Sequence, residues 1–274
     1  MSNGNYAGQA LTRVRAKVEQ GKKHLHQLEA EVRSFLDSNP FEVASRRDPQ
    51  SHELIYYVAR VKEVPYAIAA TAADVLLNLR RALDHLACEF VVAAGNYPTR
   101  NTGFPVSASA GIYKAQLAEK IEGMHRDAVK PIEASKPYKG GNDALWCLHA
   151  LGNVDKQRLL TLTGVVYRFD EMTPTALENI RRLWQAQPYS SEPFPDSPPA
   201  QAFIQWSRRP WPVKEGEVLF VDLADAKVDR QKGFRFDVAL GEGKIANGVI
   251  LVAALKEMLS AVEMVLSDCR SLFE

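Results

Sequence analysis

Hydrophobic residues recur at alternating steps of three and four near the start of the chain, which is the spacing of one face of a helix. The positions that share this spacing are Leu11, Val14, Val18, Gly21, Leu25, Leu28, Val32 and Phe35. They predict a helix over about residues 8–37. We expect it to end before Pro40, because a proline disfavours helical geometry in the residue that precedes it.

Three further stretches have the same helical spacing. The C-terminal stretch predicts a helix over about residues 246–273, on Leu251, Leu255, Met258, Val262, Val265, Cys269 and Leu272. A second helix is predicted over 66–94, where Pro65 stands at the start and Gly95 at the end. A shorter helix is predicted over about 141–158. Four amphipathic helices favour a four-helix bundle as the core.

Other segments alternate hydrophobic and polar residues with the period of a β-strand. Residues 40–63 predict a β-hairpin inserted between the first two helices. Residues 159–244 predict a second insertion with a small antiparallel sheet, including a strand at 202–206 and a proline-rich connector at 187–200. The predicted fold class is therefore mainly α within α+β, with the whole chain, 1–274, as a single domain.

Composition and charge exclude several classes of protein. The chain has 34 Lys and Arg against 33 Asp and Glu, so it lacks the overall positive charge of a protein that holds nucleic acid mainly through phosphates. Three cysteines without close pairing predict reduced thiols and a cytoplasmic protein. No stretch has the composition of a signal peptide or the length of about 18 uncharged residues that a membrane span needs.

The predicted helix over 66–94 carries charged residues inside the stretch LRRALDHL, residues 79–86. At about 100° per residue, one polar band off the apolar face holds Asp74, Asn78, Arg81 and His85. Arg80 and Asp84 lie together on the opposite flank. Residues four apart are neighbours on a helix, so each group can form internal hydrogen bonds or ion pairs.

The predicted helix over 141–158 has a similar polar band, which holds Asn142, His149, Asn153 and Lys156. Asp155 instead projects toward the apolar face. Burying an unpaired carboxylate is very costly, so we expect it to find a partner among Arg80, Arg158 and His85. If this helix neighbours the helix over 66–94, the two polar bands line one cleft.

Two motifs carry a resemblance to known proteins. LRRALDHL together with LHALGNVDKQR, residues 148–158, resembles the paired signature L-R-x-A-L-D-H and N-x-D-K-H-R of a group of uncharacterised bacterial proteins of similar size. This chain departs from the signature at Gln157, where the group has histidine. Arg80 and His85 also match the R-x4-6-H spacing of the HEPN superfamily, helical proteins that are often dimeric. Many active HEPN members cut RNA without a metal.

The HEPN resemblance implies a metal-independent endoribonuclease, related to a toxin or to phage defence, with no cofactor. His85 would transfer the proton of the ribose hydroxyl or leaving oxygen, Arg80 would stabilise the charge on the phosphoryl oxygens, and Asp84 would orient the histidine. The predicted binding residues are Asn78, Arg81, His149, Asn153, Asp155, Lys156 and Arg158. Residues five apart diverge by about 140° on a helix, so this site needs a crevice edge, a helix distortion or a subunit interface.

Two other hypotheses account for the same residues. In the first, they are interhelical ion pairs of a non-catalytic scaffold or partner-binding protein, most simply a homodimer. In the second, the cleft binds a small ligand or nucleotide without turnover. Trp206 and Trp211, beside two arginines, are a further candidate for stacking single-stranded bases. The partners expected are therefore RNA or a nucleotide and a second copy of the chain, with no membrane.

Overall fold

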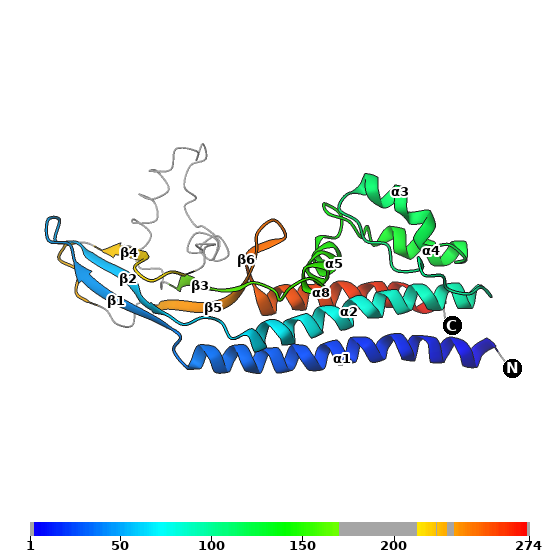
Figure 1. The fold of residues 1–274 in the computed structure, drawn as a ribbon, viewed down its shortest axis with the longest axis horizontal. Coiled ribbons are helices and arrows are strands. Elements are labelled where there is room, and N and C mark those ends of the chain that lie inside the picture. The colour runs from blue at the N-terminus through cyan, green and yellow to red at the C-terminus, as the bar shows by residue number, and fades with distance from the viewer. Residues whose placement is uncertain (1–2, 170–212, 223, 229–232, 273–274) are drawn as a thin grey trace. The chain divides into compact units, whose positions relative to one another are not determined.

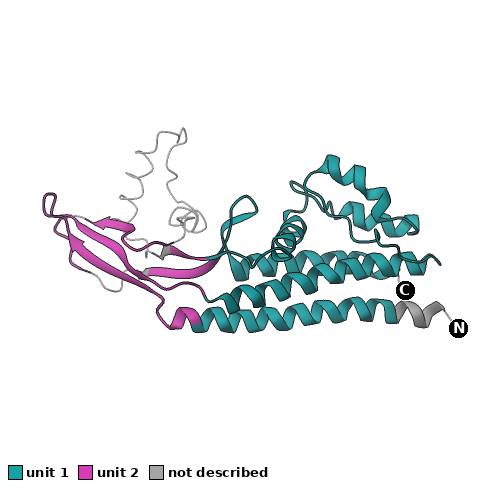
Figure 2. Cartoon of the chain, viewed as in Figure 1, with its two compact units in different colours: residues 1–34, 65–162, 240–274 teal, residues 35–64, 163–239 magenta. Residues whose placement is uncertain are grey.

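The chain divides into two compact units in the computed structural model, which describes residues 3–169, 213–222, 224–228 and 233–272 (Figures 1 and 2). The first unit, residues 1–34, 65–162 and 240–274, is mainly helical. The second, residues 35–64 and 163–239, is mainly β. The fold is thus α+β. The predicted strand at 202–206, the connector at 187–200 and both Trp206 and Trp211 lie outside the described residues.

Three long helices form most of the first unit: α1 (Asn3–Asp37), α2 (Tyr66–Ala93) and α8 (Leu251–Asp268). The hydrophobic positions predicted for the first helix are buried, apart from the half-buried Phe35. Ion pairs join α1 to both neighbours, through Arg13 with Glu89 of α2 and Lys22 with Glu263 of α8. Gly21 interrupts the apolar series for a steric reason, because a Cβ there would lie 3.2 Å from Leu79 Cδ2 of α2.

The fourth predicted helix is α5 (Asp143–Asp155), which packs against α2 and α8. Its buried side, Leu145, Leu148 and Leu151, has no exposed surface. The side chain of Asn142 accepts a hydrogen bond from the amide of Leu145, so this residue of the predicted polar band is the N-cap of the helix. The α2–α5 contact brings together the two helices that carry the candidate motifs.

Two short helices between α2 and α5 were not predicted: α3 (Ala110–Lys120) and α4 (Arg126–Ala134). The hydrophobic spacing of α3 is weak, since Tyr113 is its one buried residue. α4 is short and contains Pro131, a residue that disfavours the interior of a helix. Both begin with a side-chain cap. The Ser109 hydroxyl accepts from the amide of Ile112, and His125 Nδ1 accepts from the amide of Asp127.

The predicted hairpin is confirmed in the second unit, where β1 (Phe41–Arg47) pairs antiparallel with β2 (Leu54–Val61). The periodicity predicts one sheet for the later strands, whereas the described ones divide between two sheets. β4 (Val218–Asp222) joins the hairpin along β2, with Leu54 opposite Asp222. The periodicity of a strand predicts which of its residues face the core, but not which distant strand pairs with it.

The other sheet has the order β3-β5-β6, from β3 (Leu162–Phe169), β5 (Gly233–Glu242) and β6 (Ala246–Ile250). The predicted start of the last helix at residue 246 is wrong, because residues 246–250 form β6 and α8 begins at Leu251. Gly248 has φ +69°, which lies outside the right-handed helical region. At the other end, Leu272 follows α8 in a short 3₁₀ turn and is exposed.

No helix in the described ranges is long and apolar enough to cross a membrane.

The core of the second unit depends on a glycine in β3. Phe41, Val58, Val166 and Val213 form its buried cluster, and the Phe41 ring stacks on Phe236 with centroids 5.0 Å apart. A Cβ at Gly164 would overlap the Phe41 ring. The Phe41 ring can therefore stack on Phe236 because residue 164 has no side chain.

We expect Gly164→Ala to lower the free energy of unfolding by about 1–3 kcal/mol, because the added methyl forces a packed ring to move. Gly152→Ala in α5 is the matched control, since nothing lies within 4 Å of the added carbon. The control should be neutral or stabilising by about 0.5–1 kcal/mol. Urea denaturation of both variants checks this, and equal effects would contradict the steric explanation.

Candidate functional site

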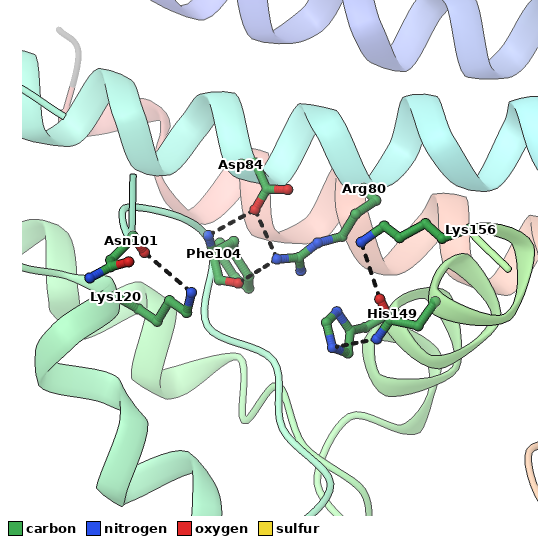
Figure 3. A network of polar contacts seen from close by, with 8 residues as sticks. Arg80, Asp84, Asn101, Phe104, Lys120, His149 and Lys156 are labelled. Atoms are coloured by element: carbon green, nitrogen blue, oxygen red, sulfur yellow. Dashed lines mark hydrogen bonds and ion pairs between the residues drawn. The ribbon is translucent and has the colours of Figure 1, made fainter. Parts of the chain in front are cut away.

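Arg80 of α2 is the centre of a polar cluster (Figure 3). Its Nη2 donates to Asp84 Oδ1 at 2.8 Å and to the carbonyl oxygen of Phe104 at 2.7 Å. Asp84 Oδ1 also accepts from the amide of Phe104 at 3.1 Å. One turn of α2 thereby fixes the backbone of the segment 101–104.

Local sequence explains this arrangement. Arg80 and Asp84 are four residues apart on α2, so their side chains are neighbours on one face. The segment approaches them closely at Gly103, where an added Cβ would lie 3.2 Å from Asp84 Oδ1. The segment is also tied to the end of α3, because the amide of Gly103 donates to the carbonyl of Lys120.

One nitrogen of Arg80 has no partner. The side chain is 18% exposed, and its Nη1 is buried without a hydrogen-bond acceptor among the described residues. Burial lowers the pKa of Arg80 and the charge of Asp84 opposes this shift, but an arginine keeps its proton in proteins. A buried donor without an acceptor costs about 1–3 kcal/mol. Arg80 therefore presents a donor that an incoming acceptor would satisfy.

A hydrogen-bond chain on α5 fixes the tautomer of His149. Lys156 Nζ donates to Asn153 Oδ1 at 3.2 Å, so the amide nitrogen of Asn153 faces His149 Nε2 at 3.0 Å. An amide nitrogen only donates, hence Nε2 accepts and the neutral ring carries its proton on Nδ1. Figure 3 shows the other edge of the ring turned toward the Arg80 guanidinium. The Nδ1–H group is therefore a second donor beside Arg80.

His149 is neutral at physiological pH. Burial is the main cause that lowers its pKa from 6.5 to about 4, followed by the positive charges of Arg80 and Lys156. Asp84 opposes the shift, and Lys120 adds to it. These charges surround the ring from α2, α3 and α5. The ring thus supplies a hydrogen bond without a charge.

Two lysines complete the group, which we call the Arg80–His149 cluster: Arg80, Asp84, Lys120, His149 and Lys156. Lys120 Nζ donates to the carbonyl of Asn101 at 3.3 Å, and Lys156 Nζ donates to the amide oxygen of Asn153. Within the described part of the chain, neither lysine makes an ion pair with a carboxylate. The cluster therefore carries positive charge that no carboxylate of the described residues neutralises through an ion pair.

The rest of the predicted band on α2 lies apart from this cluster. Arg81 and His85 are exposed, while the buried side chain of Asn78 donates to the carbonyl of Asp74 at 2.9 Å. No hydrogen bond or ion pair between His85 and Arg80 occurs in the residues that the structure describes. The structure thus brings Arg80 and Asp84 together, and it does not bring His85 to them.

Asp155 and Arg158, also predicted binding residues, have other surroundings. Asp155 is half-buried, and burial raises the pKa of its carboxyl together with the nearby charge of Asp74. None of the three expected partners pairs with Asp155 among the described residues. Arg80 binds Asp84, Arg158 binds Glu242 at 2.7 Å, and no ion pair between His85 and Asp155 is present there. Glu242 is 4% exposed and also accepts from the amide of Thr161. Arg158 therefore has a structural partner.

Sequence reasoning missed the contribution of the segment 101–104 and of Lys120. The carbonyl of Phe104 is a backbone group, which has no sequence signature. Lys120 lies at the end of α3, a helix with weak hydrophobic spacing. Gly103 was the one available signal, since a glycine permits close approach of the backbone.

Neither similarity to known proteins nor a cluster of metal ligands indicates a function for this site. No family model, curated protein or solved structure matches the chain. In the described ranges, no group of three or more His, Cys, Asp and Glu side chains is placed to hold a metal ion. The chemistry of the site therefore follows from its own donors and charges.

We expect the His149 imidazole to titrate near pH 4 in the folded protein, because burial and adjacent cations disfavour its charged form. The folded pKa lies below the ordinary 6.5, so the unfolded chain takes up the proton first. Stability linked to His149 is complete above pH 6.5 and falls as the pH drops toward 4. Heteronuclear NMR of the ring nitrogens measures the titration and the Nδ1–H tautomer.

His149→Gln is the control, since it should lack this part of the pH dependence of unfolding. A titration midpoint near 6.5, or a ring protonated at Nε2 in the neutral state, would contradict the geometry of the cluster.

Proposed function

We propose that this chain binds a ligand with a phosphate group, in a nucleotide or in RNA, at the Arg80–His149 cluster. The observation that carries the proposal is the buried Nη1 of Arg80, a charged donor with no acceptor among the described residues. A phosphate oxygen would satisfy it, and hydrogen bonds between arginine and phosphate are among the strong ones in proteins.

The other donors of the cluster support the same ligand. Neutral His149 offers Nδ1–H on the side of the ring that faces Arg80 (Figure 3). Lys120 and Lys156 add positive charge near the ring. Asp84 holds the guanidinium through Nη2 and leaves Nη1 free of it. The site thus combines an oriented arginine with two lysines that have no carboxylate partner among the described residues, which suits an anion better than a neutral ligand.

The scaffold supplies the two halves of this site from separate helices. We interpret α1, α2, α5 and α8 as the core of a four-helix bundle, in which the contact between α2 and α5 keeps Arg80 beside His149. A purely structural role for the same residues is the competing explanation. It would leave the chain a non-catalytic scaffold whose arginine only anchors the segment 101–104.

A metal-independent endoribonuclease of HEPN type is a second candidate. It is favoured by the exposure of His85, which leaves that imidazole accessible to a ribose hydroxyl. Because Arg80 is directed toward Asp84 and Phe104 in its own chain, this mechanism needs a second copy that brings its histidine to the phosphate. A homodimer is part of that proposal.

We expect Arg80→Gln and His149→Ala to weaken the binding of adenosine monophosphate by about ten-fold or more each, the effect of losing a charge-assisted or buried hydrogen bond. Isothermal titration calorimetry measures this. Arg81→Gln is the matched control, because Arg81 is the exposed neighbour on the same helix. Normal circular dichroism of each variant shows that the fold persists.

Equal affinity in wild type and both variants, or no binding by the wild type, would contradict the proposal. A fall in melting temperature without any ligand binding would favour the structural role.

For the second candidate, the wild type should cut mixed RNAs in the presence of a chelator, and His85→Ala should abolish cutting with little change in melting temperature. Electrophoresis of the products measures this. Cutting that survives in His85→Ala, or that requires a divalent metal, would eliminate the HEPN mechanism.

A further inference from the structure

We propose that the ligand of the Arg80–His149 cluster carries a phosphate monoester, with two negative charges on a terminal phosphate, and not a phosphodiester. This inference rests on the proposed function and narrows its ligand class. It favours a 5′-nucleotide or another small phosphomonoester over the interior of an RNA strand.

The charge balance of the cluster is the first reason. Arg80 and Asp84 form an ion pair at 2.8 Å, so their charges offset each other. His149 is a neutral donor. The two lysines remain, and among the described residues their amino groups contact only neutral oxygens, the carbonyl of Asn101 and the amide of Asn153. The surplus of two positive charges matches a dianion.

The number of donors is the second reason. Arg80 Nη1 and His149 Nδ1 lack acceptors among the described residues, and each lysine has further N–H groups beyond the one bond given to it. A phosphomonoester presents three strong acceptor oxygens and close to two charges at neutral pH. A diester presents two unesterified oxygens and one charge. The monoester therefore satisfies more of the donors in this cluster.

The experiment compares adenosine monophosphate with cyclic 3′,5′-adenosine monophosphate by calorimetry on the full chain, with adenosine as the measure of binding by the base alone. Methyl phosphate and dimethyl phosphate form a second pair without a base. We expect each monoester to bind at least about ten-fold more tightly than its diester, a difference of about 1.4 kcal/mol, because its second negative charge interacts with the two lysines.

A charge-removal variant tests the cause of the preference. Lys156→Gln removes one of the two surplus charges at an exposed position, so it should fold normally and reduce the preference for the monoester. Lys114→Gln is the matched control, because Lys114 is an exposed lysine of α3 outside the cluster. It should leave both affinities unchanged.

The outcomes separate this inference from the proposed function. Equal binding of monoester and diester, both dependent on Arg80, would overturn the inference and leave phosphate binding in place. Tighter binding of the diester would also overturn it and would favour the endoribonuclease. No binding of either compound would overturn both proposals.

Discussion

The bond from the Arg80 guanidinium to Asp84 and to the Phe104 carbonyl is the interaction on which the candidate site depends. Both bonds come from Nη2, and Nη1 stays buried without an acceptor among the described residues. Charge-assisted hydrogen bonds hold the planar group in a fixed orientation. The segment 101–104 is fixed at the same time, and with it the carbonyl that Lys120 contacts.

The second constraint is the packing of α5 against α2. His149, Asn153 and Lys156 form one hydrogen-bonded row on α5, and this row defines which edge of the imidazole carries a proton. Burial and nearby cations keep the ring neutral. An oriented arginine and a neutral donor therefore lie near two lysines that have no carboxylate partner among the described residues, and the groups come from three helices and the segment 101–104.

Helix periodicity predicted α1, α2, α5 and α8, because each buries one continuous apolar face. The same periodicity placed His149, Asn153 and Lys156 in one band and Arg80 beside Asp84, since residues three and four apart are helical neighbours. It did not predict the approach of the segment 101–104, which is a tertiary contact made by backbone atoms. The HEPN spacing of Arg80 and His85 was a sequence match without a contact in the described structure, because residues five apart face different sides of a straight helix.

The pairing of strands that are distant in sequence could not be predicted from local residue patterns either. The hairpin of β1 and β2 was predicted because its strands are adjacent in sequence, whereas β4 reaches β2 from residues far along the chain. The apolar residues of β6 continue into those of α8, so the periodicity predicts one helix over both, and Gly248 marks the change of backbone conformation.

A crystal structure of the chain grown with adenosine monophosphate at neutral pH is the most direct test of the account. It should show a phosphate oxygen within hydrogen-bond distance of both Arg80 Nη1 and His149 Nδ1, while Arg80 Nη2 keeps its bonds to Asp84 and Phe104. A phosphate bound at another surface, with Arg80 Nη1 still lacking a ligand acceptor, would contradict it.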